Sequence, residues 1–193
     1  MLVGRAEYTL YHDTIASASV GASALHASLY NDDTSLYGSK QQEALHFIGT
    51  YGPWLTRAVV TRIDINPRNP GRRNGLITMG SFDGSYNVAT KGWSVSGELA
   101  YKFTPNSGPF TEIVSYLNYS AYYKDRSDFR DSERYILGAA LTVREVKGLY
   151  IYSEFRFGRN DPYTGIGNYG QGTGSGGTNR WATTYLTNIG YYF

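Results

Sequence analysis

Apolar and polar residues alternate along most of this chain. Between residues 93 and 103 the odd-numbered positions are Trp, Val, Gly, Leu, Tyr and Phe, and the even-numbered positions are Ser, Ser, Glu, Ala and Lys. The same two-residue period recurs over 113–123, 135–143, 149–157 and 181–193, and less regularly over 2–11, 15–30, 43–51 and 55–65. A period of two is typical of β-strands whose two faces meet different surroundings. The pattern predicts nine strands, and no segment shows the period of a helix.

The length of these strands separates two all-β folds. Several run ten to thirteen residues, whereas strands of soluble sandwiches average about five or six and membrane-spanning strands need about nine to eleven. The apolar rows are aromatic at their ends, as at Trp93 and Phe103, which is typical of the aromatic girdles of membrane barrels. We therefore expect residues 1–193 to form one transmembrane antiparallel β-barrel domain. A soluble β-sandwich binding module, with its polar row in water, is an alternative.

Composition excludes several other classes of protein. The 193 residues carry 18 Lys and Arg against 16 Asp and Glu, and this net charge of +2 is too small for a nucleic-acid-binding surface. The 19 Tyr residues argue against disorder, and the absence of Cys excludes disulfides and thiolate metal sites. No window is apolar enough for a membrane-spanning helix, and the first residues lack the pattern of a signal peptide. We expect a cytosolic protein, a mature form, or a piece of a longer chain.

The last predicted strand carries the most specific signal. It ends in Thr-Asn-Ile-Gly-Tyr-Tyr-Phe, with Phe193 at the terminus and apolar residues two and four positions before it. This ending resembles the C-terminal β-signal of bacterial outer-membrane proteins, and the alternating strands are similar to those of porins. The resemblance implies insertion into the outer membrane by the barrel-assembly machinery, through an assembly signal that comprises Tyr185, Ile189, Tyr191 and Phe193. It also implies contact with outer-membrane lipid, a passive channel for small hydrophilic solutes or ions, and scope for a homo-oligomer.

The connections between the predicted strands alternate in length. Short turns lie at 12–14, 51–53, 104–109 and 145–148, and longer polar segments lie at 31–42, 66–92, 125–133 and 159–180. Outer-membrane barrels place short turns on the periplasmic side and long loops outside. With nine strands, the first and the last run in the same direction, so we expect an open sheet that is the C-terminal part of a larger barrel. If residues 76–82 and 86–89 add a strand, a small closed barrel with a structural, adhesive or surface-binding role results instead.

The polar rows of the strands hold the candidate pore-lining residues. In the lumen of a barrel such side chains face water and bias which ions pass. The candidates are Arg5, Glu7, Arg62, Asp64, Glu98, Lys102, Glu112, Asn118, Lys124, Arg134, Arg144, Glu154 and Arg156. Seven cations against five anions favour at most a slight anion or neutral-solute preference, and we expect Arg134, Arg144 and Arg156 to share one patch. Alternatively, most of these charges form ladders between neighbouring strands.

Candidate catalytic groups are sparse. The chain has three His residues, His12, His26 and His46. Asp32 and Asp33 lie just beyond His26 and could form an acid/base group with it. The run Asn-Asp-Asp-Thr at that point is more typical of a turn. We therefore expect no enzyme activity, no metal site and no cofactor.

Two polar segments complete the picture. The Gly-rich stretch 165–177 lacks the Lys of a phosphate-binding loop, and we interpret it as a mobile outer loop. The segment 66–92 concentrates Arg68, Arg72 and Arg73. It is either a surface loop, which we favour, or a segment that folds into the barrel, narrows it and presents guanidinium groups to anionic solutes.

Overall fold

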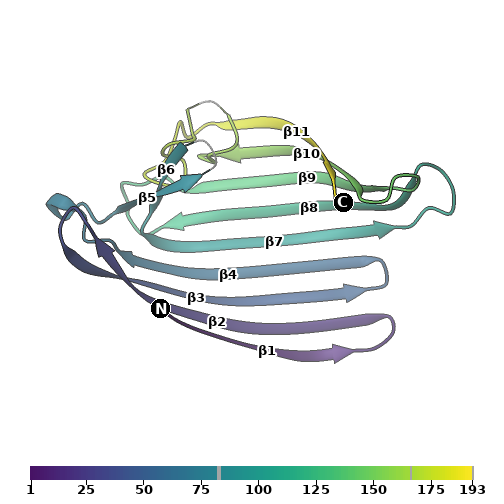
Figure 1. The fold of residues 1–193 in the computed structure, drawn as a ribbon, viewed down its shortest axis with the longest axis horizontal. Coiled ribbons are helices and arrows are strands. Elements are labelled where there is room, and N and C mark those ends of the chain that lie inside the picture. The colour runs from purple at the N-terminus through teal and green to yellow at the C-terminus, as the bar shows by residue number, and fades with distance from the viewer. Residues whose placement is uncertain (82–83, 166, 193) are drawn as a thin grey trace.

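The computed structural model describes residues 1–81, 84–165 and 167–192, and in them the chain is almost entirely β-structure. Nine of the described strands form one sheet and two form a separate hairpin (Figure 1). The sheet contains β1 (Leu2–His12), β2 (Ala16–Asn31), β3 (Leu36–Tyr51), β4 (Trp54–Asn66), β7 (Lys91–Phe103), β8 (Phe110–Lys124), β9 (Ser132–Val143), β10 (Leu149–Arg159) and β11 (Trp181–Tyr191). The hairpin pairs β5 (Leu76–Ser81) with β6 (Gly84–Ala89), and it follows the 3-10 helix η1 (Pro70–Arg72).

The strands lie in the sheet in the order in which they occur in the chain, with the β5–β6 hairpin inserted between β4 and β7. Every neighbouring pair is antiparallel. β1 and β11 form the two edges, and both run toward the same end of the molecule (Figure 1). In the described residues no ladder joins these edges. The expected nine antiparallel strands in an open sheet are thus confirmed, and a ten-stranded closed sheet is excluded because β5 and β6 pair with each other.

The connections differ between the two ends of the sheet. Residues 13–15, 52–53, 104–109 and 144–148 form the short turns, and residues 32–35, 67–90, 125–131 and 160–180 connect strands at the opposite end. Two of the expected long loops need correction. The first is only 32–35, because β3 begins at Leu36, and the second contains the β5–β6 hairpin. The boundaries of the other two move by one or two residues.

Cross-strand register sorts the side chains of the sheet into two faces, because residues paired across a ladder point to the same side. One row across β4 and β7–β11 consists of Thr56, Leu99, Leu117, Leu137, Phe155 and Tyr185. The adjacent row, one residue along each strand, consists of Arg57, Glu98, Asn118, Ile136, Arg156 and Thr184. We call the two sides the apolar face and the polar face.

The apolar face is the more exposed of the two. Leu117, Leu137 and Tyr185 on this face are 52%, 56% and 57% exposed, whereas Ala100 and Glu154 on the polar face are 3% and 8% exposed. Within the described parts of the chain, the only other sheet is the small β5–β6 hairpin, and it makes no extensive contact with any strand of the main sheet. The described residues therefore lack the second layer that a soluble β-sandwich would pack against its apolar face.

Candidate functional site on the polar face

Charged side chains on the polar face pair with one another. Arg57 of β4 and Glu98 of β7 are cross-strand neighbours whose charged atoms lie 3.5 Å apart. Near the β1 edge, Arg5 donates to Glu7 at 2.7 Å, and His46 Nε2 lies 3.2 Å from the same carboxylate. Such exposed pairs add little to the stability of a protein, because water and salt screen them. Their larger effect here is to cancel charge along the face.

Glu154 of β10 is the most closely held charge on this face. Tyr116 Oη donates to Glu154 Oε1 at 2.6 Å, and Arg156 Nε donates to Glu154 Oε2 at 2.7 Å. The Tyr116 ring reaches the carboxylate by lying over Gly138, where an added Cβ would be 2.4 Å from the ring atom Cζ. A glycine at 138 is thus required for this contact. Because Arg156 neutralises Glu154, the pair adds little net field.

Asn118 lies in the central row beside Glu98, and the other charged candidates on the polar face lie toward its ends. Lys102 and Glu112 form an ion pair near the short turns. At the opposite end, Arg134 lies 3.3 Å from Asp161 of the 160–180 loop. Lys124 Nζ donates to the carbonyl oxygens of Arg130 and Gly172. Lys124 therefore ties loop backbone together instead of standing free above the face.

The expectation that Arg62 and Asp64 belong to the polar row is wrong. The register of β4 pairs Arg62 with Trp93 and Asp64 with Lys91, all on the apolar face. There the Arg62 guanidinium lies 5.5 Å from the Trp93 ring centre and binds both carboxylate oxygens of Asp125, at 2.7 and 2.6 Å. Asp64 accepts a hydrogen bond from Lys91 at 2.9 Å. Both residues lie at the loop end of β4, where charges on the apolar face find partners in neighbouring loops and strands.

The expected patch of Arg134, Arg144 and Arg156 is also wrong. Arg144 follows the last residue of β9 and lies at the short-turn end, whereas Arg134 lies near the start of that strand. Its guanidinium donates to the carbonyl oxygens of Pro105, Gly108 and Phe110, at 2.8, 3.0 and 2.9 Å. Arg144 therefore fixes the β7–β8 turn.

The β5–β6 hairpin and the 160–180 loop pack together at the loop end of the sheet. Asn87 N donates to Gly170 O at 2.8 Å, and Ala89 N donates to Thr173 O at 2.9 Å. The buried hydroxyl of Tyr122, which belongs to the polar face, donates to Ala89 O and fixes the base of the hairpin on the sheet. We call the hairpin and the loop together the cover. Arg68, Arg72 and Arg73 lie outside it and are exposed.

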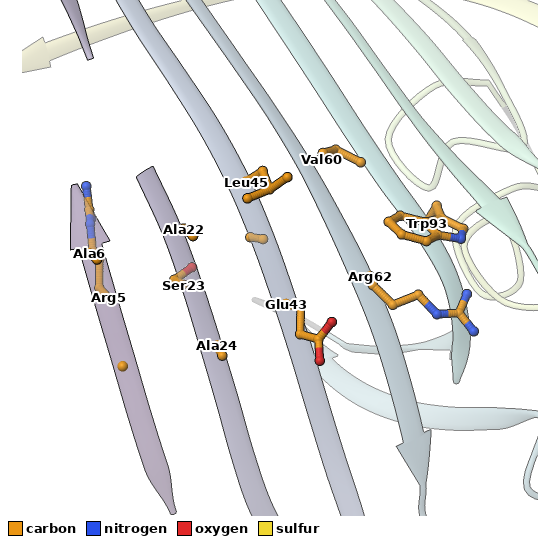
Figure 2. A pocket seen from close by; sticks show the side chains of 12 residues that line it. Arg5, Ala6, Ala22, Ser23, Ala24, Glu43, Leu45, Val60, Arg62 and Trp93 are labelled. Atoms are coloured by element: carbon orange, nitrogen blue, oxygen red, sulfur yellow. The ribbon is translucent and has the colours of Figure 1, made fainter. Parts of the chain in front are cut away.

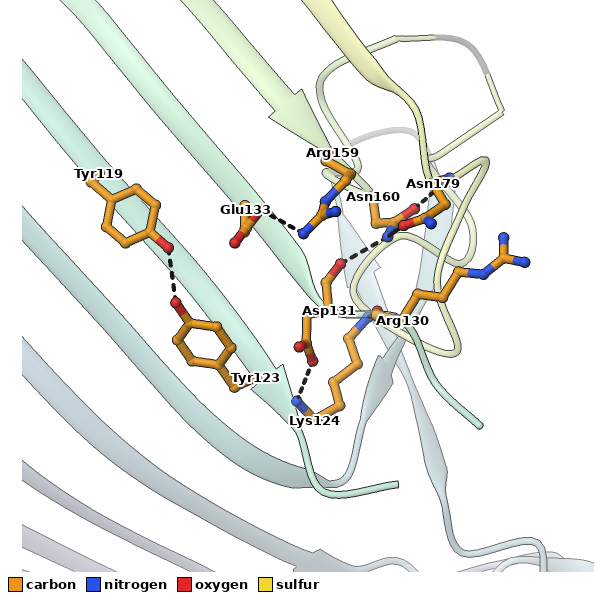
Figure 3. Close-up of polar contacts among 9 residues, drawn as sticks. All are labelled: Tyr119, Tyr123, Lys124, Arg130, Asp131, Glu133, Arg159, Asn160 and Asn179. Atoms are coloured by element: carbon orange, nitrogen blue, oxygen red, sulfur yellow. Dashed lines mark hydrogen bonds and ion pairs between the residues drawn. The ribbon is translucent and has the colours of Figure 1, made fainter. Parts of the chain in front are cut away.

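Buried asparagine side chains hold the 160–180 loop in place. Asn160 Nδ2 donates to Asp131 O at 2.8 Å and to Asn179 Oδ1 at 3.1 Å (Figure 3). Asn168 donates to Thr164 O at 2.9 Å and accepts from Thr178 N at 2.9 Å. Asn160 and Asn168 are 0% and 1% exposed. The loop that contains the Gly-rich stretch is thus tied to the 125–131 loop and to itself.

A cavity of about 270 Å³ lies between the cover and the polar face. β7, β8 and β9 supply Ser94, Ser120 and Arg134, and the cover supplies Tyr86, Asp161 and Tyr163. The cover thus brings together residues more than 70 positions apart in the sequence. The cavity is thus built jointly by the sheet and its loops.

A shallower hollow of about 610 Å³ lies mainly on the apolar face (Figure 2). Small residues of β1 and β2, such as Ala6, Ala22 and Ala24, form its floor, and Leu45 and Trp93 stand at its rim. The hollow exists because side chains on β1 and β2 are short. The residues around it are mostly apolar, like those of the rest of the apolar face.

His26 lies within β2, whereas Asp32 and Asp33 follow the end of that strand. His26 pairs with Leu2 at the loop end of β2, and His46 belongs to the Arg5–Glu7 cluster. Asp33 lies in the β2–β3 turn, where its backbone N donates to the Asn31 side chain at 3.1 Å. Across the described ranges, no group of three His, Asp or Glu side chains could hold a metal ion. A helix long and apolar enough to cross a membrane is also absent from the described residues.

The proposed assembly residues lie on the last strand. Tyr185, Ile189 and Tyr191 share the apolar face of β11, and the Tyr185 ring centre is 4.9 Å from that of Phe155. All three side chains are more than half exposed. Phe193 lies outside the described residues.

The sequence reasoning missed Arg57, Tyr116 and Asp161. Arg57 and Arg62 are an odd number of positions apart, so they lie on opposite faces of β4. The turn at 52–53 sets Tyr51 opposite Trp54, and this register would have identified the face of Arg57. Tyr116 has the parity of the polar positions in 113–123, but nothing in the sequence indicates its bond to Glu154. Asp161 reaches the sheet only through the fold of a long loop. Comparison with protein families, with curated protein sequences and with solved structures gives no match, and the function is therefore argued from the geometry.

Proposed function

We propose that this sheet is part of the wall of an outer-membrane β-barrel, and that its polar face lines a passive channel for small hydrophilic solutes. One observation carries the proposal: the apolar face is continuous and exposed, whereas the polar face is the sheltered one. In water, each half-exposed Leu or Phe side chain forgoes part of the roughly 1.5–3 kcal/mol that full burial contributes. Lipid removes this penalty. Soluble monomers rarely expose a contiguous apolar surface of more than a few hundred Å².

The dimensions of the apolar face suit a bilayer. On β7, Trp93 and Tyr101 bracket Val95, Gly97 and Leu99. The eight residue-to-residue steps from Trp93 to Tyr101 span about 27 Å along the strand. At a strand tilt of about 40° this becomes roughly 20 Å along the membrane normal, close to the ~25 Å apolar band of outer-membrane barrels.

Neighbouring strands extend both aromatic rows. Tyr101 packs edge-on against Trp54 with ring centres 4.8 Å apart, at the short-turn end. At the loop end, Tyr135 packs against Tyr119 at 4.8 Å and against Trp181 at 5.9 Å. Amphipathic rings at two levels of an apolar face are the arrangement expected at the two membrane interfaces.

The edges of the sheet define how a barrel would close. β1 and β11 run in the same direction, so an all-antiparallel barrel needs an odd number of further strands between them. Seven additional strands would give sixteen, a size at which barrels hold an aqueous channel. We therefore place the sheet in a larger, porin-like barrel, with the cover inside its outer mouth.

The charges on the polar face favour a weakly selective channel. Arg57, Arg134 and Arg156 each have a carboxylate partner, as do Arg5 and Lys102. A lumen lined by paired charges produces little net field at the distance of a passing ion. Neutral solutes and ions of both signs should pass.

The orientation of the faces can be tested because the chain contains no Cys. Leu117→Cys and Asn118→Cys alter neighbouring residues of β8 that lie on opposite faces. Each variant is labelled with a polarity-sensitive fluorophore and reconstituted in vesicles that contain nitroxide-labelled lipid. We expect lipid quenching at 117 and quenching by aqueous iodide at 118. Equal lipid quenching at both positions would contradict the proposal.

Channel function itself is tested by planar-bilayer recording in KCl. An open pore gives steady single-channel conductance, whereas a plugged barrel with a structural or adhesive role gives none. The orientation experiment thus tests whether the sheet is part of a membrane barrel, and the conductance experiment tests whether that barrel is a channel.

A further inference from the structure

We propose that the cavity beneath the cover is a binding site for a neutral, hydroxyl-rich solute of about the size of one sugar ring. This inference deepens the proposed function and rests on it, because a solute reaches the polar face only if that face borders water. The cavity lies where the cover would narrow the channel, so a solute that crosses the membrane would pass it.

The size of the cavity sets the size of the ligand. Its volume of about 270 Å³ is just below the range of roughly 300–1,000 Å³ found for drug-sized ligands. One sugar ring or a polyol of similar size fits this volume, whereas an extended oligosaccharide would project from it.

Tyrosine rings form one wall of the cavity. Tyr86 of β6 and Tyr163 of the 160–180 loop line it, and both pack against Tyr169, with ring centres 6.1 and 6.3 Å from the Tyr169 ring. Three contacting rings from two segments make a fixed aromatic wall. The C–H faces of a sugar ring pack well against such a surface, while its hydroxyls remain free to bind elsewhere.

The floor of the cavity supplies hydrogen-bonding groups. Ser94 and Ser120 are cross-strand diagonal neighbours on the polar face, and a Ser hydroxyl can both donate and accept. Arg134 Nε is buried and has no hydrogen-bond partner among the described residues. A buried donor without a partner is unusual and calls for one, and a ligand hydroxyl in the cavity would satisfy it.

The charges around the cavity cancel, which favours a neutral ligand. Arg134 pairs with Asp161, and Glu133 accepts from Arg159 at 2.8 Å. A bound anion would be repelled by Asp161, and a bound cation would be repelled by Arg134. A neutral polyol uses the guanidinium as donor and the carboxylate as acceptor without leaving a charge unpaired.

The test compares D-glucose with two charged molecules of similar size, D-gluconate and D-glucosamine. Influx of each into proteoliposomes is measured over a range of concentrations, and saturation-transfer NMR detects direct binding to the protein in detergent micelles. We expect glucose influx to saturate and glucose protons to receive saturation, and we expect neither for gluconate or glucosamine.

The double variant Ser94→Ala/Ser120→Ala removes the two floor hydroxyls. Among the described residues, no side-chain hydrogen bond of either serine would be lost. Since one hydrogen bond corresponds to roughly a five- to tenfold change in affinity, the glucose half-saturation concentration should rise tenfold or more. Conductance in KCl should remain. The control Ser115→Ala, on the apolar face of β8, should leave both unchanged.

Linear glucose influx together with no NMR binding signal, in a protein that conducts KCl, would overturn the site and leave the channel standing. If the protein does not conduct, the channel fails, and NMR alone decides the site. Glucose binding that the double variant abolishes would then support the site, and binding that the variant leaves intact would overturn it.

Discussion

Gly138→Ala is expected to weaken the sheet much more than an ordinary glycine substitution does. The new methyl group would lie 2.4 Å from Tyr116 Cζ and 2.6 Å from its hydroxyl oxygen, so the ring must move. Movement of the ring breaks the 2.6 Å hydrogen bond from Tyr116 to Glu154. Overpacking of this kind costs about 1–3 kcal/mol, and loss of a hydrogen bond to a charged group costs about 1.5–3 kcal/mol. We expect the free energy of unfolding to fall by about 3 kcal/mol.

Gly97→Ala is the matched control. Gly97 also stands directly across a ladder from a tyrosine, Tyr119, but a methyl group there would meet only Arg57 O, at 3.9 Å. Because Ala restricts the unfolded chain more than Gly does, this change should be neutral or stabilise by up to about 1 kcal/mol. Urea unfolding in lipid vesicles, followed by Trp fluorescence, measures both variants.

A double-mutant cycle then isolates the contact between the ring and the glycine. In a Tyr116→Ala background no ring lies over residue 138, so Gly138→Ala should cost less than about 1 kcal/mol. The coupling between the two positions should thus reach about 2 kcal/mol. Equal effects of the Gly138 and Gly97 substitutions, or additivity of the two changes in the cycle, would refute this account of the Tyr116–Glu154 contact.

Three further predictions concern the two faces and the loops. Leu137→Lys, on the apolar face, should destabilise the protein in vesicles by about 2 kcal/mol or more, whereas Asn118→Lys on the polar face should cost under about 1 kcal/mol by the same unfolding assay. Arg57→Gln leaves a carboxylate unpaired on the polar face, so the reversal potential in a salt gradient should shift toward cation selectivity, most strongly at low salt; no shift would place that residue outside the conducting path. The Arg62 guanidinium lowers the pKa of the Asp125 carboxyl, so the pair should stabilise the fold above the unfolded pKa of about 4 and lose this contribution as pH falls through the lower folded value. Because the Asp125 side chain is 36% exposed, the loss should stay below about 1 kcal/mol, and Asp125→Asn should abolish this part of the acid dependence of urea unfolding.

The number of strands in the main sheet could be predicted because most strands carry apolar residues on one face and polar residues on the other. Alternation is clear in β7, β9 and β10, and the register places Leu99, Leu137 and Phe155 on the same face. Alternation does not mark every strand. The start of β3, from Leu36 to Gln42, is polar and was taken for a loop. It pairs with β2 all the same.

The face of β4 was ambiguous for a different reason. β-branched residues occur at both parities in this strand, and the charges Arg57 and Arg62 lie on opposite faces. Only the turn register decides between them. The cavity was beyond prediction because its wall and floor come from segments whose approach depends on backbone hydrogen bonds of the cover, such as that from Asn87 to Gly170. No pattern along the sequence encodes those contacts.

The neighbour-to-neighbour order of the strands has a kinetic consequence. Each hairpin can add to the edge of the one already formed, so most of the sheet closes only short loops, whose entropic cost is small. The bonds that join Asn87 and Ala89 to Gly170 and Thr173 are different, because each closes a loop of more than 80 residues. They can form only after β7 to β10 are in place. We expect the cover to be the last part of the molecule to order during folding, and the first to open when the protein fluctuates.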